Sequence, residues 1–405
     1  MRNFALDWDG SRGSISKRPW EPFWDSSKDK CRSLMLRVAI VGCGKIADQH
    51  VQAIHRIPDC RIVAVCDREL LMARQLGERW GIAATFADVT EMLKSSDLDV
   101  VHITTPPQGH FELAKRCLES GRHVYVEKPF TVTAAEADSL VRLAESRSLK
   151  MTAGHNYQFS REMLEMRHLV GQGFLGGPPV HVESYFSYDL GDWSYVGPLL
   201  GSRDHWVRRL PGQLLHNVIS HGIAKLAEFL GDDLTDIVAV ADQSPRLRSL
   251  GGDEILDELR VLIRDKSGAT ASFCFSTQMR PGLNELRIYG PVNSIVVDQT
   301  SGSLIRRKSR SYKSYLSFFI PPLENAREHF RNARRNVADF VARRLYHDFG
   351  MTELIGLFYR SITTGQAPPI AYREIVLTSR IMDEIFAQIY GAKAEDSRQE
   401  RERPV

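Results

Sequence analysis

The sequence predicts an α/β chain of two domains, a doubly wound parallel sheet followed by an α+β domain with a largely antiparallel, open-faced sheet. Three observations predict this fold. From Leu36 onward, short apolar runs alternate with amphipathic stretches, as in βαβ units. A glycine-rich turn follows the first apolar run, where a buried strand would pass into a helix. After about residue 155 the β-rich runs mostly follow one another without helices, which favours an antiparallel sheet.

Length and composition bound the class of protein. The chain has 405 residues, enough for about two to three domains, and its 43% apolar and 25% charged residues are average for a globular protein. The net charge of +3 is nearly balanced, so no nucleic acid partner is expected. The chain has neither an apolar run of about 18 residues nor an N-terminal secretory pattern. We therefore expect no membrane span.

The six cysteines predict reduced thiols. They form no Cys-x-x-Cys pair and no Cys/His cluster at zinc spacing, so we expect no metal. Several lie within predicted strands, where a small apolar residue suffices. A cytoplasmic location is the resulting expectation.

We expect four segments along the chain. Residues 1–34 are polar and lack periodicity, and two interpretations are open: an arm that packs on the body or on a partner subunit, or a stretch ahead of a true start at Met35. Residues 35–155 carry the parallel sheet and residues 156–390 the second domain. Residues 391–405 form a charged tail.

The first strand, 36–41, ends in the turn Gly42-Cys43-Gly44-Lys45-Ile46-Ala47, which has the spacing of a Rossmann dinucleotide-binding loop. Gly42 permits a tight turn, Gly44 lets the main chain approach a pyrophosphate, and Ala47 lets the next helix pack on the strand. That helix, expected over 45–57, would direct its free N–H groups at phosphates. Glycine pairs also mark ordinary turns, so the motif alone is weak.

Asp67 supports the interpretation of the glycine turn. It follows the strand 61–66 and lies about 20 residues beyond Ala47, where the fingerprint has an acid that binds the adenosine ribose. The alternative role is a cap for the helix 69–80. An acid here disfavours a 2′-phosphate and favours NAD, whereas the neighbouring Arg68 could pair with that phosphate and keeps NADP open.

Two further strands lead into residues that a ligand could contact. The strand 99–103 leads into Thr104-Thr105-Pro106, and a helix follows over 110–120. The strand 123–126 leads into Glu127-Lys128-Pro129, at the carboxyl end where open α/β sheets bind ligands. The alternative for Lys128 is a surface salt bridge before a turn.

The remaining elements complete both domains. In the first domain we expect a helix over 134–146 and a strand over 151–155. In the second, the β-rich runs cover 179–187, 234–242, 257–264, 269–277 and 284–298. Helices are expected over 213–230, 324–346, 351–363 and 374–390.

Together these motifs resemble the Gfo/Idh/MocA family, named for glucose-fructose oxidoreductase, inositol dehydrogenase and a rhizopine-catabolism protein. The resemblance spans about 36–390 and rests on the turn at 42–47, Thr105-Pro106 with His110, Glu127-Lys128-Pro129, and a helix with His221. It implies NAD, or alternatively NADP, on the first domain. It also implies that the second domain binds substrate and forms a homodimer or homotetramer through its open sheet face. The cofactor-binding residues that it implies are Gly42, Gly44, Lys45, Ile46, Ala47, Asp67, Arg68, Thr104, Thr105, Pro106, His110, Glu127 and Lys128.

The catalytic residues also come from the resemblance. In the family, the lysine of Glu-Lys-Pro lies beside the reacting hydroxyl, and the second-domain helix supplies an Asp-x-x-x-His pair. On this sequence the matching residues are Lys128, Asn217 and His221, the last two also as substrate contacts. Asn217 departs from the pattern, because a carboxamide cannot take a proton.

The chemistry of alcohol oxidation suits these three residues. His221 would remove the hydroxyl proton, Lys128 would stabilise the alkoxide or relay the proton, and Asn217, on the same helix face as His221, would orient the substrate. The alternative for His221 is a core histidine that is hydrogen-bonded across a helix interface.

Other polar residues are weaker candidates. Tyr157 follows the last strand of the first domain and could contact substrate, or it could belong to a plain linker. Arg208, in a loop with other cations, could hold an anionic sugar, although a solvated surface is the ordinary alternative. The basic run 306–310 and the arginines 327, 331, 334, 335, 343 and 344 form either a solvated face or a contact for an anionic membrane surface or polyanionic saccharide.

The leading function is therefore an NAD(P)-dependent dehydrogenase that acts on a CH–OH group of a sugar, nucleotide sugar or cyclitol. One alternative is an NAD-dependent glycosidase of the same fold. The other, which the Asn217 departure suggests, is a non-catalytic NAD(P)-binding regulatory protein.

Overall fold

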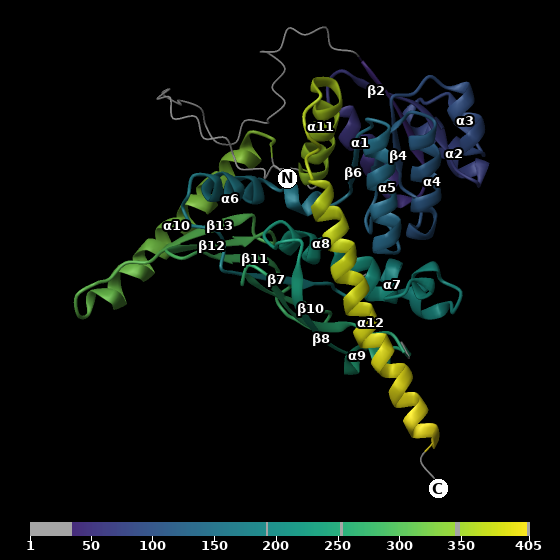
Figure 1. The fold of residues 1–405 in the computed structure, drawn as a ribbon. Coiled ribbons are helices and arrows are strands. Elements are labelled where there is room, and N and C mark those ends of the chain that lie inside the picture. Colours follow the sequence, from purple (N-terminus) through teal and green to yellow (C-terminus); the bar gives the residue numbers. More distant parts are fainter. Residues whose placement is uncertain (1–34, 192, 252–253, 345–348, 403–405) are drawn as a thin grey trace.

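A computed structural model describes residues 35–191, 193–251, 254–344 and 349–402, so the predicted arm over 1–34 lies outside the described part. These residues form two sheets, each with helices packed on it, and two C-terminal helices that run along the domains (Figure 1).

The first sheet has six parallel strands in the order β3-β2-β1-β4-β5-β6. This is the doubly wound order that the apolar runs predict, and it reverses between β1 and β4, where such sheets bind ligands. Its strands are β1 (Leu36–Val41), β2 (Cys60–Cys66), β3 (Ala84–Phe86), β4 (Val100–Ile103), β5 (His123–Val126) and β6 (Met151–Ala153). Its helices are α1 (Lys45–His55), α2 (Leu70–Trp80), α3 (Val89–Ser95), α4 (His110–Glu119) and α5 (Ala134–Ser146), with the 3-10 turn η1 (Pro107–Gly109).

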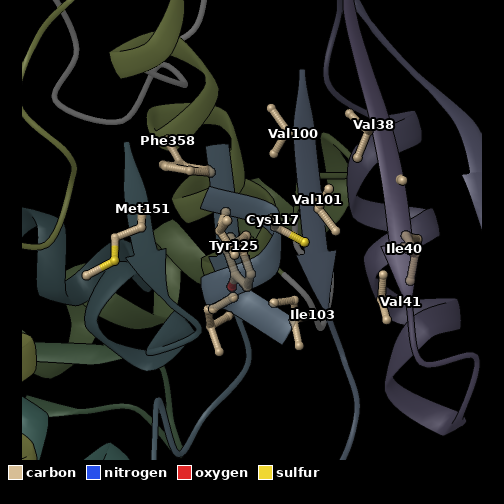
Figure 2. Close-up of a cluster of buried hydrophobic side chains, with 14 of the residues drawn as sticks. Val38, Ile40, Val41, Val100, Val101, Ile103, Cys117, Tyr125, Met151 and Phe358 are labelled. Carbon is tan, nitrogen blue, oxygen red and sulfur yellow. The ribbon is translucent and has the colours of Figure 1, made fainter. Parts of the chain in front are cut away.

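The core of this domain is built from the strands' apolar runs. Val38 and Ile40 of β1, Val101 of β4 and Tyr125 of β5 are fully buried. Figure 2 shows them on neighbouring strands, with Phe358 of the C-terminal part of the chain near Tyr125. Strands buried on both faces read as nearly continuous apolar runs, which is why the sequence located them well.

The second sheet has seven strands in the order β13-β12-β11-β7-β10-β9-β8. All neighbours are antiparallel except β7 and β10, which are parallel. The helix α8 (Gln213–Ala227) packs on one face, against β7 and β10. The other face is open, with Val238, Val240 and Leu262 exposed. The strands are β7 (His181–Ser187), β8 (Leu234–Asp242), β9 (Glu258–Asp265), β10 (Thr270–Ser276), β11 (Asn284–Tyr289), β12 (Asn293–Asp298) and β13 (Ser303–Lys308).

The last two helices join the domains. The helix α11 (Phe349–Thr364) packs against α1, and α12 (Tyr372–Glu402) packs against both α5 and α8. The other elements are η2 (Asn156–Phe159), α6 (Arg161–Gly171), α7 (Trp193–Gly201), η3 (Trp206–Arg209), α9 (Pro245–Ser249) and α10 (Leu316–Val341).

Several predicted boundaries in the second domain were wrong. The run 284–298 is two strands, β11 and β12, because Gly290 and the residues after it form a turn. The helix expected over 324–346 begins at Leu316 and ends at Val341, since the helix includes Pro321 and Pro322, which the sequence pattern treats as breakers. The helix expected to end at Tyr390 continues to Glu402. The elements α6, α7, α9 and β13 of this domain were not predicted, and neither were β3 and α3 of the first domain.

Candidate functional site

The turn after β1 requires its first glycine. Gly42 has a φ of 96°, in the left-handed region, and a Cβ built on it would lie 2.7 Å from the backbone nitrogen of Thr105. The Thr104 hydroxyl donates to the Gly42 carbonyl oxygen at 2.6 Å, and the Thr104 N–H donates to Val41 at 2.8 Å. The end of β4 is thereby fixed against the turn, and a side chain at position 42 would separate them.

The second glycine leaves an open helix N-terminus. Gly44 is the N-cap of α1, no side chain caps that helix, and a Cβ at position 44 would have no neighbour within 4 Å. Lys45 is exposed, Ile46 is half-buried, and Ala47 packs in the core. Uncapped N–H groups beside open space fit a pyrophosphate, so this part of the chain suits NAD.

Asp67 bonds to backbone groups of two loops but does not cap α2, whose N-cap is Glu69 and which has no side-chain cap hydrogen bond. Its Oδ2 accepts from the Cys43 N–H at 2.7 Å, and its Oδ1 accepts from the Glu69 N–H at 2.9 Å. A carboxylate oxygen can accept more than one hydrogen bond, so the ribose role stays compatible with this geometry. The Arg68 side chain is 91% exposed and its nearest acid is Glu69 at 3.9 Å.

His110 joins two of the predicted ligand-binding loops. It is fully buried, with one ring nitrogen 2.8 Å from the Thr105 carbonyl oxygen and the other 2.9 Å from that of Pro129. Burial lowers the pKa of His110. It therefore holds Thr105-Pro106 beside Glu127-Lys128-Pro129, and its direct contact with a cofactor stays a prediction. The buried Thr105 hydroxyl has no hydrogen-bond partner among the described residues and could serve a ligand.

Lys128 connects the two domains. Its Nζ donates to the backbone carbonyl oxygen of Asn217, on α8, at 3.1 Å. Burial lowers the pKa of Lys128, and the negative charge of Glu127 opposes that change only in part. The structure thus brings together Lys128 and Asn217, and it places His221 about one helical turn further along α8.

His221 lies in an aromatic, mostly buried setting. Its ring centroid is 4.4 Å from that of Tyr157 and 6.5 Å from that of His155. Its Nδ1 is buried without a hydrogen-bond partner in the described chain. Burial, reinforced by the positive charge of Lys128, lowers the pKa of His221 well below its usual range. The imidazole is therefore neutral near pH 7 and can accept a proton. Tyr157, an uncertain candidate from sequence, lies beside it.

A buried hydrogen-bond chain that the sequence did not reveal supports Glu127. The Glu127 Oε1 lies 2.9 Å from His50 Nε2, the other His50 nitrogen lies 2.9 Å from His102, and His102 Nε2 lies 2.8 Å from the Tyr359 hydroxyl. Burial alone would raise the pKa of Glu127, but His50 and Lys128 together outweigh burial, and the pKa is lowered. Glu127 also accepts from the Lys128 N–H at 3.1 Å. Its carboxylate is thus committed to protein groups, and its cofactor contact stays a prediction.

Two of these missed residues carry a sequence signal. His50 interrupts the buried face of α1 and His102 interrupts an apolar strand, and a polar residue in an apolar pattern needs a buried partner. Tyr359 comes from a distant helix and carries no such signal. Lys225, eight residues after Asn217 on α8, was also missed. It is fully buried, donates to Asn284 at 2.7 Å and Gln299 at 3.1 Å, and burial lowers its pKa to about 7.

Arg208 lies in the loop before α8 rather than beside His221. Its Nε donates to the Leu199 carbonyl oxygen at 2.8 Å, which braces the connection between α7 and η3. The same loop is tied to the first domain, because Gln108 donates to the Trp206 carbonyl oxygen at 2.8 Å. The loop therefore adjoins the Thr105-Pro106 segment, and substrate contact by Arg208 stays a prediction.

Comparison with known proteins agrees with this geometry. A family model described as "Oxidoreductase family, NAD-binding Rossmann fold", that of Gfo/Idh/MocA, matches residues 36–155. The first domain of the chain therefore matches the NAD-binding domain of this family. Its cofactor is accordingly a nicotinamide dinucleotide, which the open helix N-terminus at Gly44 suits.

Individual relatives resemble more of the chain. A myo-inositol 2-dehydrogenase of Thermotoga maritima is 23% identical over 70% of this chain and 83% of its own length. A D-glucoside 3-dehydrogenase of Escherichia coli is 33% identical, over 37% of this chain and 43% of its own length. Among solved structures, the WlbA dehydrogenase from Bordetella pertussis in complex with NADH and UDP-GlcNAcA has a TM-score of 0.67 at 18% identity, over 88% of this chain and 96% of that chain. This last likeness supports the two-domain fold.

The described residues show neither a metal-binding cluster nor a membrane-spanning helix. They contain no group of three or more His, Cys, Asp or Glu side chains that could hold a metal ion. Over the same residues, no helix is both long and apolar enough to span a membrane.

Proposed function

We propose that this protein transfers hydride between a nicotinamide cofactor and a hydroxyl-bearing carbon of a sugar, nucleotide sugar or cyclitol. The observation that carries the proposal is the 3.1 Å hydrogen bond from Lys128 Nζ to the Asn217 carbonyl oxygen. It places an ammonium group from the cofactor-binding domain against the helix that carries His221. The names of the inositol and glucoside dehydrogenases among the relatives favour the same substrate class.

The residues divide the work as follows. When bound, the nicotinamide supplies the hydride acceptor. The neutral His221 accepts the proton of the substrate hydroxyl, and Lys128 donates a hydrogen bond to the oxygen as negative charge develops on it. Asn217 orients neighbouring hydroxyls, and Tyr157 packs against the His221 ring. Gly44, Asp67 and the free Thr105 hydroxyl hold the cofactor.

The proposal includes assembly and location. Val238, Val240 and Leu262 expose an apolar surface on the open sheet face, which suits a homo-oligomer. Their combined replacement by serine should lower the mass of the assembly in solution, and an unchanged mass would remove this contact from the proposal. A cytoplasmic site of action completes it.

A substrate panel tests the activity. The purified chain is incubated with NAD or NADP and with inositols, glucosides and UDP-sugars, while reduced nicotinamide is followed by absorbance. We expect net cofactor reduction with at least one member of the panel. Glycoside cleavage without net reduction would instead indicate the glycosidase, and cofactor binding with neither reaction would indicate the regulatory protein.

A further inference from the structure

The helix α10 packs its polar side on the body of the protein and exposes its apolar side. Its side toward the body is polar: Asn332 donates to the Leu304 carbonyl oxygen of β13 at 2.8 Å, Glu328 pairs with Arg306 at 2.7 Å, and Arg335 pairs with Glu165. Of all its residues, only Asn332 and Asp339 are buried. A surface helix normally buries its apolar stripe and exposes its polar one.

The apolar stripe of α10 points to solvent. Phe319, Phe330 and Phe340 are between 62% and 71% exposed. Together with Leu316, Leu323 and Val337 they recur every three, four or seven residues and so form one continuous line along the helix. Tyr315 and Phe318 extend it at the N-terminal end. Figure 1 shows the helix reaching beyond the edge of the second sheet, past β13. We call this line of residues the apolar stripe.

The charge around the apolar stripe is positive and unneutralised. Between residues 303 and 344 the acids are Glu324, Glu328 and Asp339, and each is paired with arginine, respectively with Arg310, with Arg306 and Arg331, and with Arg161 and Arg344. Six exposed cations of the same segment form no ion pair with any residue that the structure describes: Arg307, Lys308, Lys313, Arg327, Arg334 and Arg343.

We propose that α10 docks this protein on an anionic lipid surface, with the apolar stripe inserted between acyl chains and the unpaired cations at the headgroups. Phenylalanine and leucine on one side and arginine beside them are the features of a helix that lies in the membrane interface. A second copy of the chain is a poorer occupant, because pairing two such faces would bring cations against cations. The proposal is independent of the catalytic activity.

Vesicle binding by the full chain tests the proposal. Vesicles of equal parts phosphatidylcholine and phosphatidylglycerol, or of phosphatidylcholine alone, are sedimented with the protein. We expect binding to the anionic vesicles, weakened by salt, and little binding to the neutral ones.

Two variants and two controls separate the contributions. Phe319→Ser with Phe330→Ser should lower the partition coefficient by at least about tenfold for each phenylalanine. Arg327→Glu with Arg334→Glu should lower it by at least roughly twentyfold, because each cation near an anionic surface contributes about a fivefold factor. Leu71→Ser and Arg74→Glu, both exposed on α2, should leave binding unchanged. All six positions are exposed, so the variants and controls should fold, and NAD binding verifies that they do.

Three results would overturn the proposal. The first is no binding to anionic vesicles, or binding that neither variant weakens. The second is that the protein does not bind vesicles and that Phe319→Ser with Phe330→Ser lowers its mass in solution. This result would make the apolar stripe an interface between copies of the chain. The third is salt-sensitive retention on dextran sulfate that the phenylalanine variants leave unchanged and vesicles do not reproduce, which would indicate a polyanionic saccharide.

Discussion

At the domain boundary, the cofactor edge of the first sheet and the helix α8 that faces it satisfy their polar groups differently. On the cofactor edge, Thr104, Asp67 and His110 each bond to backbone groups of neighbouring loops, and the Thr105 hydroxyl is buried without a partner among the described residues. On and beside α8, the Nδ1 atoms of His216 and His221, the Ser220 hydroxyl and both ring nitrogens of His155 are buried without a hydrogen-bond partner among the described residues.

The difference indicates that the cofactor edge suits the cofactor and that the α8 side suits the substrate. Each buried unsatisfied polar group costs about 1–3 kcal/mol, so such groups need a ligand or water to bond with. The cofactor edge is already rigid before any ligand arrives, which suits a cofactor of constant shape. The α8 side retains hydrogen-bonding capacity, which suits a substrate with several hydroxyls.

Lys128→Ala should have the largest effect, because it removes the side chain whose amino group bonds across the domain boundary to the backbone of α8. We expect turnover to fall by about a thousandfold, in the range for loss of an acid–base or electrostatic group. NAD affinity should stay within about twofold. Steady-state kinetics on the true substrate and NAD titration measure both. Lys94→Ala, exposed on α3, is the matched control, and normal turnover of Lys128→Ala would exclude Lys128 from catalysis.

His50→Phe tests whether the rigid side depends on its buried hydrogen-bond chain. The change leaves the buried Glu127 carboxylate without its imidazole partner, which should cost roughly 3 kcal/mol in the free energy of unfolding. Because Glu127 also accepts from the Lys128 N–H, turnover should fall as well, by about tenfold. Urea unfolding and kinetics are the measurements. His55→Phe, exposed on the same helix, should lower neither the stability nor the turnover. Equal stability of the two variants would show that the buried hydrogen-bond chain does not support the site.

Substitutions at the two glycines of the turn test stability and cofactor binding separately. Gly42→Ala places a methyl group 2.7 Å from the Thr105 nitrogen at a positive φ, so we expect a loss of roughly 2–3 kcal/mol in stability. Gly44→Ala meets no protein atom within 4 Å. It should keep its stability and lose NAD affinity, because the methyl group occupies the space for the pyrophosphate. If Gly44→Ala binds NAD as tightly as the unaltered chain, the pyrophosphate does not approach this turn.

The sequence predicted the cofactor edge of the first sheet better than the α8 side of the boundary, for a physical reason. Strands buried on both faces are apolar throughout, and a tight turn demands glycine, so β1, Gly42 and Asp67 follow from local rules. The parallel order and the open second sheet were confirmed. The helix with His221 was also predicted in place, but its role came from family resemblance, since a histidine in an apolar helix is equally a core residue.

The residues that were missed depend on distant chain segments. His102 is bonded by Tyr359, which lies 257 positions away, and the buried Lys225 donates hydrogen bonds to Asn284 and Gln299. The local pattern of apolar and polar residues cannot predict pairs that are so far apart in the sequence. The apolar stripe of α10 was missed for a different reason. Its pattern predicts a buried face, and only the structure shows that the polar face is the one that packs.

Asn217→Asp should have the smallest effect, and it tests whether residue 217 acts on His221 on the α8 side of the boundary. A carboxylate one helical turn from His221 would favour the protonated imidazole and raise the pKa of His221. Because His221 must be neutral to accept the proton, activity falls as the pH drops through that pKa. The acidic limb of the kcat/KM profile should therefore move to higher pH. Asn325→Asp, exposed on α10, adds the same charge elsewhere and should leave the profile in place. A profile unmoved by Asn217→Asp would show that residue 217 does not act on the titration of His221, and would leave Asn217 with the role of its backbone carbonyl, which holds Lys128.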